Sequence, residues 1–236
     1  YRKNYSDLST YKATKDFIRD EVFGKENVRE YLQCLCKELE IHVDKAASYR
    51  DWFFIAEKKA EIQVMAAQYK ISVELEELCG PFINYILKNF GKLSAEMGEN
   101  TPVLVSRAMD YMHDHSKKFV LIVMDGMSEF DWKILSRSFG DVEYDLSHVM
   151  AMIPTVTSIS RQCLLSNKFP LALENPWSQS KEKKEFIDCA RRMGYSDVQI
   201  GYDRGYEAEF GAAVSCAAII INDADDMVHG QLQGRT

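Results

Sequence analysis

Two short stretches made only of apolar residues constrain the fold of this chain more than any other feature. They are residues 119–124 (FVLIVM) and residues 217–221 (AAIII). A continuous apolar run of this length is typical of a β-strand that is buried on both faces of a sheet. We therefore expect a mostly parallel α/β sheet flanked by helices, and we expect the strand at 119–124 to be buried on both of its faces.

The segments around these runs alternate between helical and extended patterns. Strands and helices that alternate at this spacing support a parallel sheet. A mixed-charge stretch at 181–185 predicts a helix face that is exposed to water. The elements that we expect are a helix from Ser128 to about Arg137, an extended segment over 144–153, helices over 157–166 and 178–192, and a short strand over 198–200.

Residues 1–100 show helical periodicity and no motif that carries chemistry. Apolar residues recur every three or four positions over 44–69, and again over 82–90. We expect an all-helical region over 1–100, followed by an α/β region over 101–236. The helix breaks that we expect lie at Gly80-Pro81, Gly91 and Gly98.

The charge balance argues against a protein that binds nucleic acid directly. The chain is 46% hydrophobic and 28% charged, with a formal net charge of −7. Residues 1–100 carry 15 basic and 17 acidic groups and residues 101–236 carry 14 and 19, so neither part has the basic excess of a phosphate-backbone binder.

No run approaches the roughly 20 apolar residues of a membrane-spanning helix, so we expect no membrane association. Six cysteines without CxxC spacing suit a reduced, cytoplasmic protein.

Acidic residues follow both apolar runs. Asp125 comes directly after the first run, and Asp225 and His229 follow the second. Ligands of open α/β sheets bind at the carboxyl ends of the strands, so we expect these residues at one edge. Asp225 and His229 are four positions apart and share one helix face, where oxygen and imidazole donors would suit zinc or manganese. Either motif alone is also common in an ordinary strand-to-helix turn.

A third segment, PTVTSISR at 154–161, brings several hydroxyl groups to the start of a helix. Helix capping, worth about 1 kcal/mol, explains one of them. A hydroxyl at a helix N-terminus also lies where anions are favoured, and beside a divalent metal it can attack phosphorus. Arg161 lies one turn after Thr157 on the same face, where it could bind a phosphate oxygen. Capping and catalysis are compatible interpretations.

Together the three segments resemble the PglZ domain, a branch of the alkaline phosphatase superfamily. The resemblance covers residues 103–236 and rests on VLIVMDGMSEFDW, MIPTVTSISRQCLLSNKFP and IINDADDMVHG. It implies that Asp125 and Thr157 bind one metal, that Thr157 is also the nucleophile, and that Asp225 and His229 bind a second metal. The cofactors it implies are two divalent metals, zinc or else manganese. Their remaining ligands, an Asp-His pair and one more His, are expected beyond residue 236.

The resemblance also implies a function. It implies an alkaline-phosphatase-like fold and a metal-dependent phosphohydrolase or phosphodiesterase, with a phosphate ester or nucleotide as substrate and Arg161 orienting the phosphate. PglZ proteins are associated with bacterial phage defence of the BREX type and with signalling proteins, which implies protein partners. One alternative is a catalytically silent PglZ-like scaffold that docks other proteins. A nucleotide-binding α/β domain ranks below both, because the chain contains neither GxxxxGK[ST] nor GxGxxG.

Overall fold

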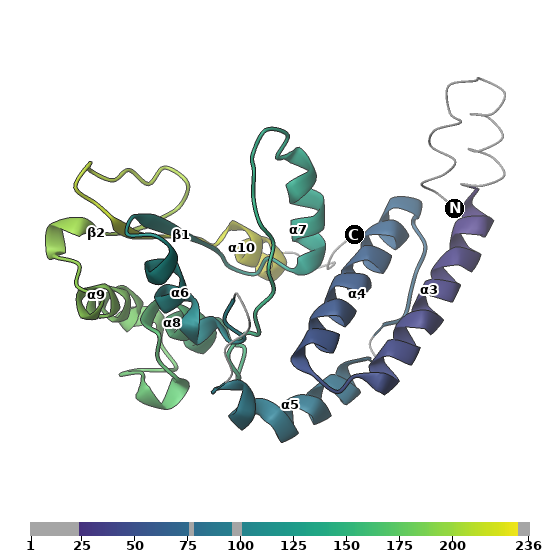
Figure 1. Cartoon of the computed structure of the whole chain (residues 1–236). Helices are drawn as coiled ribbons and strands as arrows, with labels where there is room; N and C mark the ends of the chain where they lie inside the picture. The colour runs from purple at the N-terminus through teal and green to yellow at the C-terminus, as the bar shows by residue number, and fades with distance from the viewer. Residues whose placement is uncertain (1–23, 76–77, 96–100, 231–236) are drawn as a thin grey trace. The chain divides into compact units, whose positions relative to one another are not determined.

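The computed structural model describes residues 24–75, 78–95 and 101–230. The chain forms two compact units (Figure 1). The first unit contains residues 1–88 and 129–142, and the second contains residues 89–128 and 143–236. Each unit is described below by itself.

The first unit is helical. Helix α3 (Lys25–Lys45) and helix α4 (Tyr49–Tyr69) run side by side (Figure 1), and α7 (Glu129–Leu135) also packs on α4. The buried residues of α3, Val28, Leu32, Leu39 and Val43, are four or seven positions apart and so lie on one face of the helix. In α5 (Cys79–Leu93), Phe82 and Tyr85 place their rings 5.1 and 5.8 Å from the ring of Trp52.

The helix boundaries of the first unit differ from the predicted ones. The single periodic stretch expected over 44–69 is interrupted, because Ser48 and Asp51 form a capping box that starts α4 anew. Gly80-Pro81 lies in the first turn of α5 and not between helices, a position that tolerates proline because the first N–H groups of a helix have no helical partner. Gly91 lies within α5, so the end expected there was wrong; Gly98 is outside the described residues.

The second unit contains a parallel sheet of three strands in the order β1-β3-β2, so the α/β class is confirmed. The strands are β1 (Phe119–Met124), β2 (Ile200–Arg204) and β3 (Cys216–Ile221). The two apolar runs lie side by side in register, with Phe119 opposite Cys216 and Met124 opposite Ile221. Their carboxyl ends therefore meet at one edge of the sheet.

One face of this sheet is covered by helices. The helices are α6 (Ala108–His115), α8 (Thr157–Ser166) and α9 (Glu182–Arg192), and Figure 1 shows them on the same side of the strands. A fourth helix, α10 (Asp223–Gly230), follows β3. The buried residues that form the core between sheet and helices are Met109, Leu165, Phe186, Cys189, Ala190, Tyr195, Cys216, Ala218 and Ile220.

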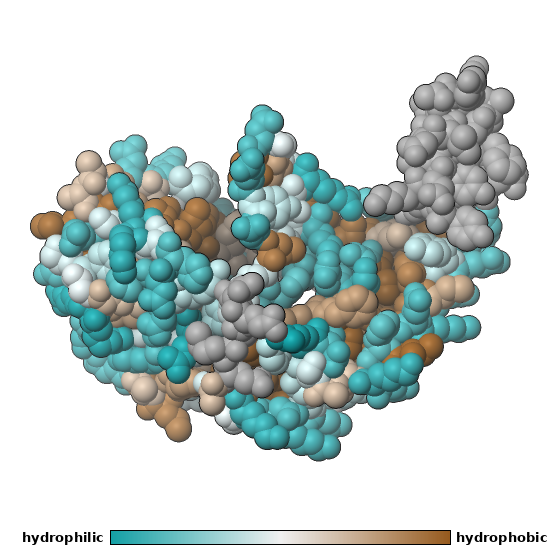
Figure 2. Space-filling view, in the orientation of Figure 1, coloured by the Kyte–Doolittle hydropathy of each residue, from teal (hydrophilic) through white to brown (hydrophobic). Residues whose placement is uncertain are grey.

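The opposite face of the sheet is exposed along β1, and this corrects the prediction that residues 119–124 are buried on both faces. Phe119, Leu121 and Val123 pack against the core, whereas the alternate residues of β1 are exposed. The exposed fractions of Val120, Ile122 and Met124 are 48%, 56% and 37%. The reason is that α6, α8 and α9 pack on the other face, so the alternate side chains of β1 remain accessible to solvent. Brown, apolar surface is visible over this part of the second unit in Figure 2.

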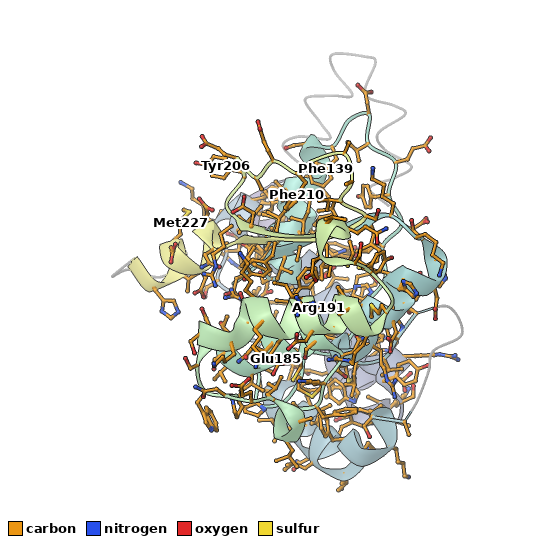
Figure 3. All side chains as sticks on the ribbon, turned by 90° about the vertical axis from the view of Figure 1, so that its left-hand side faces the viewer. Phe139, Glu185, Arg191, Tyr206, Phe210 and Met227 are labelled. Carbon is orange, nitrogen blue, oxygen red and sulfur yellow. The ribbon has the colours of Figure 1, made fainter. Side chains whose placement is uncertain are left out.

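On β2 the same face of the sheet is covered by a loop. The ring of Phe210 lies so close to Gly201 that a Cβ there would approach it to 2.6 Å. Figure 3 shows Phe210 on one side of the sheet and α9, with Glu185 and Arg191, on the other. Glycine at this position thus allows the loop to pack directly on the strand.

Three further predictions for this unit have different outcomes. The helix over 157–166 is confirmed with the same bounds. The strand expected over 198–200 begins only at Ile200, because Asp197–Gln199 forms a 3-10 turn with a Ser196–Gln199 capping box. The extended segment at 144–153 contributes a single bridge, between Met150 and Leu104.

In the described part of the chain, no helix has the length and apolarity needed to span a membrane.

Candidate active site

Asp125 and Asn222 lie next to each other where β1 and β3 end. The backbone N–H of Asp125 donates a hydrogen bond of 2.9 Å to the carbonyl of Ile221, which continues the strand pairing by one residue. Asn222 directly follows Ile221, and α10 begins at Asp223. Parallel pairing therefore brings together Asp125 and Asn222, which are 97 positions apart in the sequence.

The turn after Asp125 touches the start of α10. Gly126 has a positive φ of +71°, and a Cβ placed on it would lie 2.7 Å from both the Cα and the backbone N of Asp225. Only glycine meets both requirements without strain. Asp125 and Asp225 therefore lie at the same edge of the sheet, as expected.

The guanidinium of Arg161 reaches this edge from α8. Its Nη1 donates hydrogen bonds to Oδ2 of Asp125 at 2.7 Å and to Oδ1 of Asn222 at 3.0 Å. Its Nε donates to Oε2 of Glu182 at 2.5 Å. The side chain is only 3% exposed, and its Nη2 is buried without a hydrogen-bond partner among the described residues. Arg161 is thus a buried cation between two carboxylates, with one donor nitrogen still uncommitted.

Glu182 is a member of this cluster that the sequence analysis missed. It was assigned to a water-exposed face at 181–185, yet both Glu182 and Glu185 are buried. Besides Arg161, its carboxylate accepts hydrogen bonds from the hydroxyl of Tyr202 and, at 3.1 Å, from Nη2 of Arg204. The spacing along the helix could have indicated this burial, because Glu182 and Glu185 share a face of α9 with the apolar residues Phe186 and Cys189.

Thr157 is the first residue of α8 and lies one turn before Arg161. The residue at the N-cap position is Val156, and no side chain caps the helix. The hydroxyl of Ser160 is used elsewhere, since it accepts a hydrogen bond of 3.2 Å from the N–H of Met152. Capping therefore does not explain the hydroxyl groups at this helix start. Thr157 itself is half-buried.

Asp225 and His229 share one face of α10, as their spacing predicts. Nε2 of His229 lies 3.4 Å from Oδ1 of Asp225. The His229 side chain is 78% exposed and that of Asp225 is 29% exposed. The two side chains therefore lie next to each other and are accessible from solvent.

The electrostatics of the edge are those of a partly desolvated acidic site. Burial raises the pKa of Asp125, and the nearby carboxylates of Asp225 and Glu182 act in the same direction. The Arg161 guanidinium and the N–H of Gly126 oppose this rise in pKa. Repulsion of this kind is relieved by a cation placed between the acids.

The donors present fit a divalent metal in kind but not in number. Carboxylate, imidazole and hydroxyl groups suit zinc or manganese. Among residues 24–75, 78–95 and 101–230, however, no three His, Cys, Asp or Glu side chains gather closely enough to hold a metal ion. The described residues thus bring together fewer donors than a metal site needs.

No protein-family model matches the chain, and no curated protein matches it.

Proposed function

We propose that this chain forms part of a metal-dependent phosphohydrolase or phosphodiesterase of the PglZ type, with an alkaline-phosphatase-like fold. The observation that carries the proposal is the placement of Arg161. This buried arginine lies on the helix that begins with Thr157, and it contacts Asp125 at the carboxyl edge of the sheet. A cation, a hydroxyl at a helix start and a carboxylate at one strand end are the parts that phosphoryl transfer requires.

In this proposal Thr157 is the nucleophile. Its oxygen forms a bond to phosphorus while the bond from phosphorus to the leaving oxygen breaks, and the hydroxyl proton passes to solvent. The leaving oxygen takes a proton from solvent. Water then cleaves the bond between Thr157 and phosphorus and restores the hydroxyl. The uncapped N-terminus of α8 favours the negative charge of the phosphoryl group.

The remaining residues have binding roles. Asp125 and Thr157 would hold one divalent metal, zinc or manganese, and Asp225 with His229 would hold the other. When bound, such a metal pair stabilises negative charge on the attacking and leaving oxygens. Arg161 orients the phosphate, because Nη2 of its guanidinium has two N–H groups that no acceptor in the described part of the chain uses.

The proposed substrate is a phosphate ester or nucleotide, and the proposed setting is the cytoplasm of a bacterium, in a BREX-like phage-defence or signalling system with protein partners. This setting is supported only by the resemblance of the three motifs to the PglZ domain. The chemistry of the edge is supported by the contacts of Arg161 and Asp125.

The test is hydrolysis of bis(p-nitrophenyl) phosphate by the intact protein in the presence of zinc or manganese. We expect the Thr157→Ala and Asp225→Ala variants to lose at least about a hundredfold of the rate, because each lacks a group that acts on the reacting atoms. Ser158→Ala is the matched control, since it removes the neighbouring hydroxyl on the same helix. Equal inactivity of the wild type and both variants with either metal would overturn the proposal.

A silent interaction scaffold is the second candidate. The observation that favours it is that Arg161 and Asp125 bind each other, which neutralises both charges without any ligand. A scaffold retains its fold and its partners when Thr157 is replaced by alanine, and it shows no metal-dependent hydrolysis at all. The same assay therefore separates the two candidates.

A further inference from the structure

Glu182 is the buried acid around which the polar contacts of the sheet edge are organised. It is the first residue of α9 and is fully buried. One carboxylate oxygen accepts from Nε of Arg161, and the other accepts from Tyr202 and Arg204 at the end of β2. Each oxygen is therefore satisfied, as a buried carboxylate requires.

These contacts fix the orientation of the Arg161 guanidinium. The group is planar and its donors form a rigid fork, so acceptors at two of its nitrogens define its plane. Glu182 holds Nε, while Asp125 and Asn222 hold Nη1. Three of the five N–H groups are thus engaged. The other two are on Nη2, which is buried and has no hydrogen-bond partner within residues 24–75, 78–95 and 101–230.

The uncommitted donor is the unusual feature. A buried N–H group without an acceptor costs free energy, so it is rarely retained without a reason. Because Nη2 is covered, an oxygen atom of a ligand reaches it only when a covering side chain moves. A ligand oxyanion would then gain a charge-assisted hydrogen bond to a guanidinium that is already held in place.

We propose that Glu182 is a positioning residue of the site: it holds Arg161 so that Nη2 is directed to an oxyanion of the phosphate class. Tyr202 and Arg204 in turn hold Glu182. This inference rests on the proposed function, and it adds a residue that acts through Arg161 without touching the substrate.

The test compares Glu182→Gln with Glu185→Gln. Glu185 is the matched control, because it is also buried on α9 but pairs with Lys168, at 2.6 Å, and with the N–H of Glu174. The first readout is the side-chain Nε–H signal of Arg161 in NMR spectra. We expect Glu182→Gln to shift this signal and to speed its exchange with water, and Glu185→Gln to leave it unchanged.

The second readout is the affinity for inorganic phosphate, measured by calorimetry. We expect Glu182→Gln to weaken phosphate binding about ten- to hundredfold, the usual effect of removing a group that orients a binding residue, and Glu185→Gln to have little effect. If Glu182→Gln does not fold, Glu182→Asp keeps the negative charge but withdraws the carboxylate from Nε, and the same two changes are expected.

Two patterns of results would overturn this inference. One is phosphate binding that is absent in the wild type or equal in the Glu182 and Glu185 variants. The other is an Arg161 signal that does not respond to Glu182. Failure of the proposed function has a different signature: no metal-dependent hydrolysis, while phosphate binding still depends on Glu182.

Discussion

Nη1 of Arg161 lies 2.7 Å from Oδ2 of Asp125, although the two residues are 36 positions apart in the chain. This ion pair joins the helix that begins with Thr157 to the end of β1. Since Arg161 is almost fully buried and also binds Glu182, it is both a structural tie and the cation of the candidate site.

Replacing Arg161 by glutamine should destabilise the second unit strongly. The change leaves the carboxylate of Glu182 buried with fewer partners, and breaking a buried ion pair on one side typically costs about 3–5 kcal/mol. Arg191→Gln is the control, because Arg191 makes a similar two-bond contact with Asp197 on the exposed surface. Urea denaturation should show a large loss for the first variant and little change for the second. Equal losses would show that burial of the Arg161 pair does not determine its role.

Gly126→Ala should separate the turn after β1 from the start of α10. The new Cβ would meet the backbone of Asp225 at 2.7 Å, in addition to the strain of a positive φ. Gly205→Ala is matched in φ, at +81°, but has no atom within 4 Å of the added Cβ. We expect about 1–3 kcal/mol from backbone strain in both variants and a further loss only at Gly126. Similar unfolding free energies for the two variants would contradict the close contact.

The start of α4 should depend on pH through Asp51. Hydrogen bonds from the N–H of Ala47, and then from the hydroxyl and N–H of Ser48, lower the pKa of this carboxyl. A lowered folded-state pKa stabilises the fold above the unfolded value of about 3.9, and this contribution is lost as the pH falls through the folded-state pKa.

The variant Asp51→Asn should therefore melt at a lower temperature than the wild type at pH 7, and the difference should shrink as the pH falls below the lowered pKa of Asp51. Asp44→Asn is a suitable control, because an acid near the end of α3 gains nothing from the helix dipole. A difference between Asp51→Asn and the wild type that is independent of pH would exclude the carboxylate as its source.

Thiol labelling should distinguish the two exposed cysteines from the three buried ones. Burial raises the pKa of Cys163 and Cys216 to about 12 and that of Cys189 to about 11, so thiolate is scarce at these positions. Cys34 and Cys79 are exposed. Iodoacetamide at pH 8 should modify these two first, with the three buried thiols reacting only in denaturant, as peptide mass spectrometry can show. Early modification of Cys216 would contradict its burial in β3.

Patterns that depend on neighbouring residues alone were predictable from the sequence. The apolar runs identify β1 and β3, and the three- and four-residue spacing identifies the helix over 157–166. Parallel pairing then places Asp125 beside the start of α10 without further information. The local signals were sufficient to locate these elements, because apolar runs and helical spacing depend on nearby residues alone.

Features that depend on distant partners were not predictable. The apolar run of β1 does not reveal that Ile122 is exposed, since this depends on which face of the sheet the distant helices cover. Glu182 reads as a surface residue until Arg161 and Arg204 are placed beside it. Charged residues are rarely buried unless they are paired, and the pairing is set by tertiary structure.

The most direct test of the metal-dependent site is anomalous diffraction at the zinc edge from crystals of the intact protein grown with zinc. The proposed site predicts a zinc peak bonded to a carboxylate oxygen of Asp225 and to an imidazole nitrogen of His229, at about 2.0–2.2 Å. It predicts a second peak next to Asp125 and Thr157. Crystals saturated with zinc that show no peak at these four residues, with Arg161 still bound to Asp125, would contradict it.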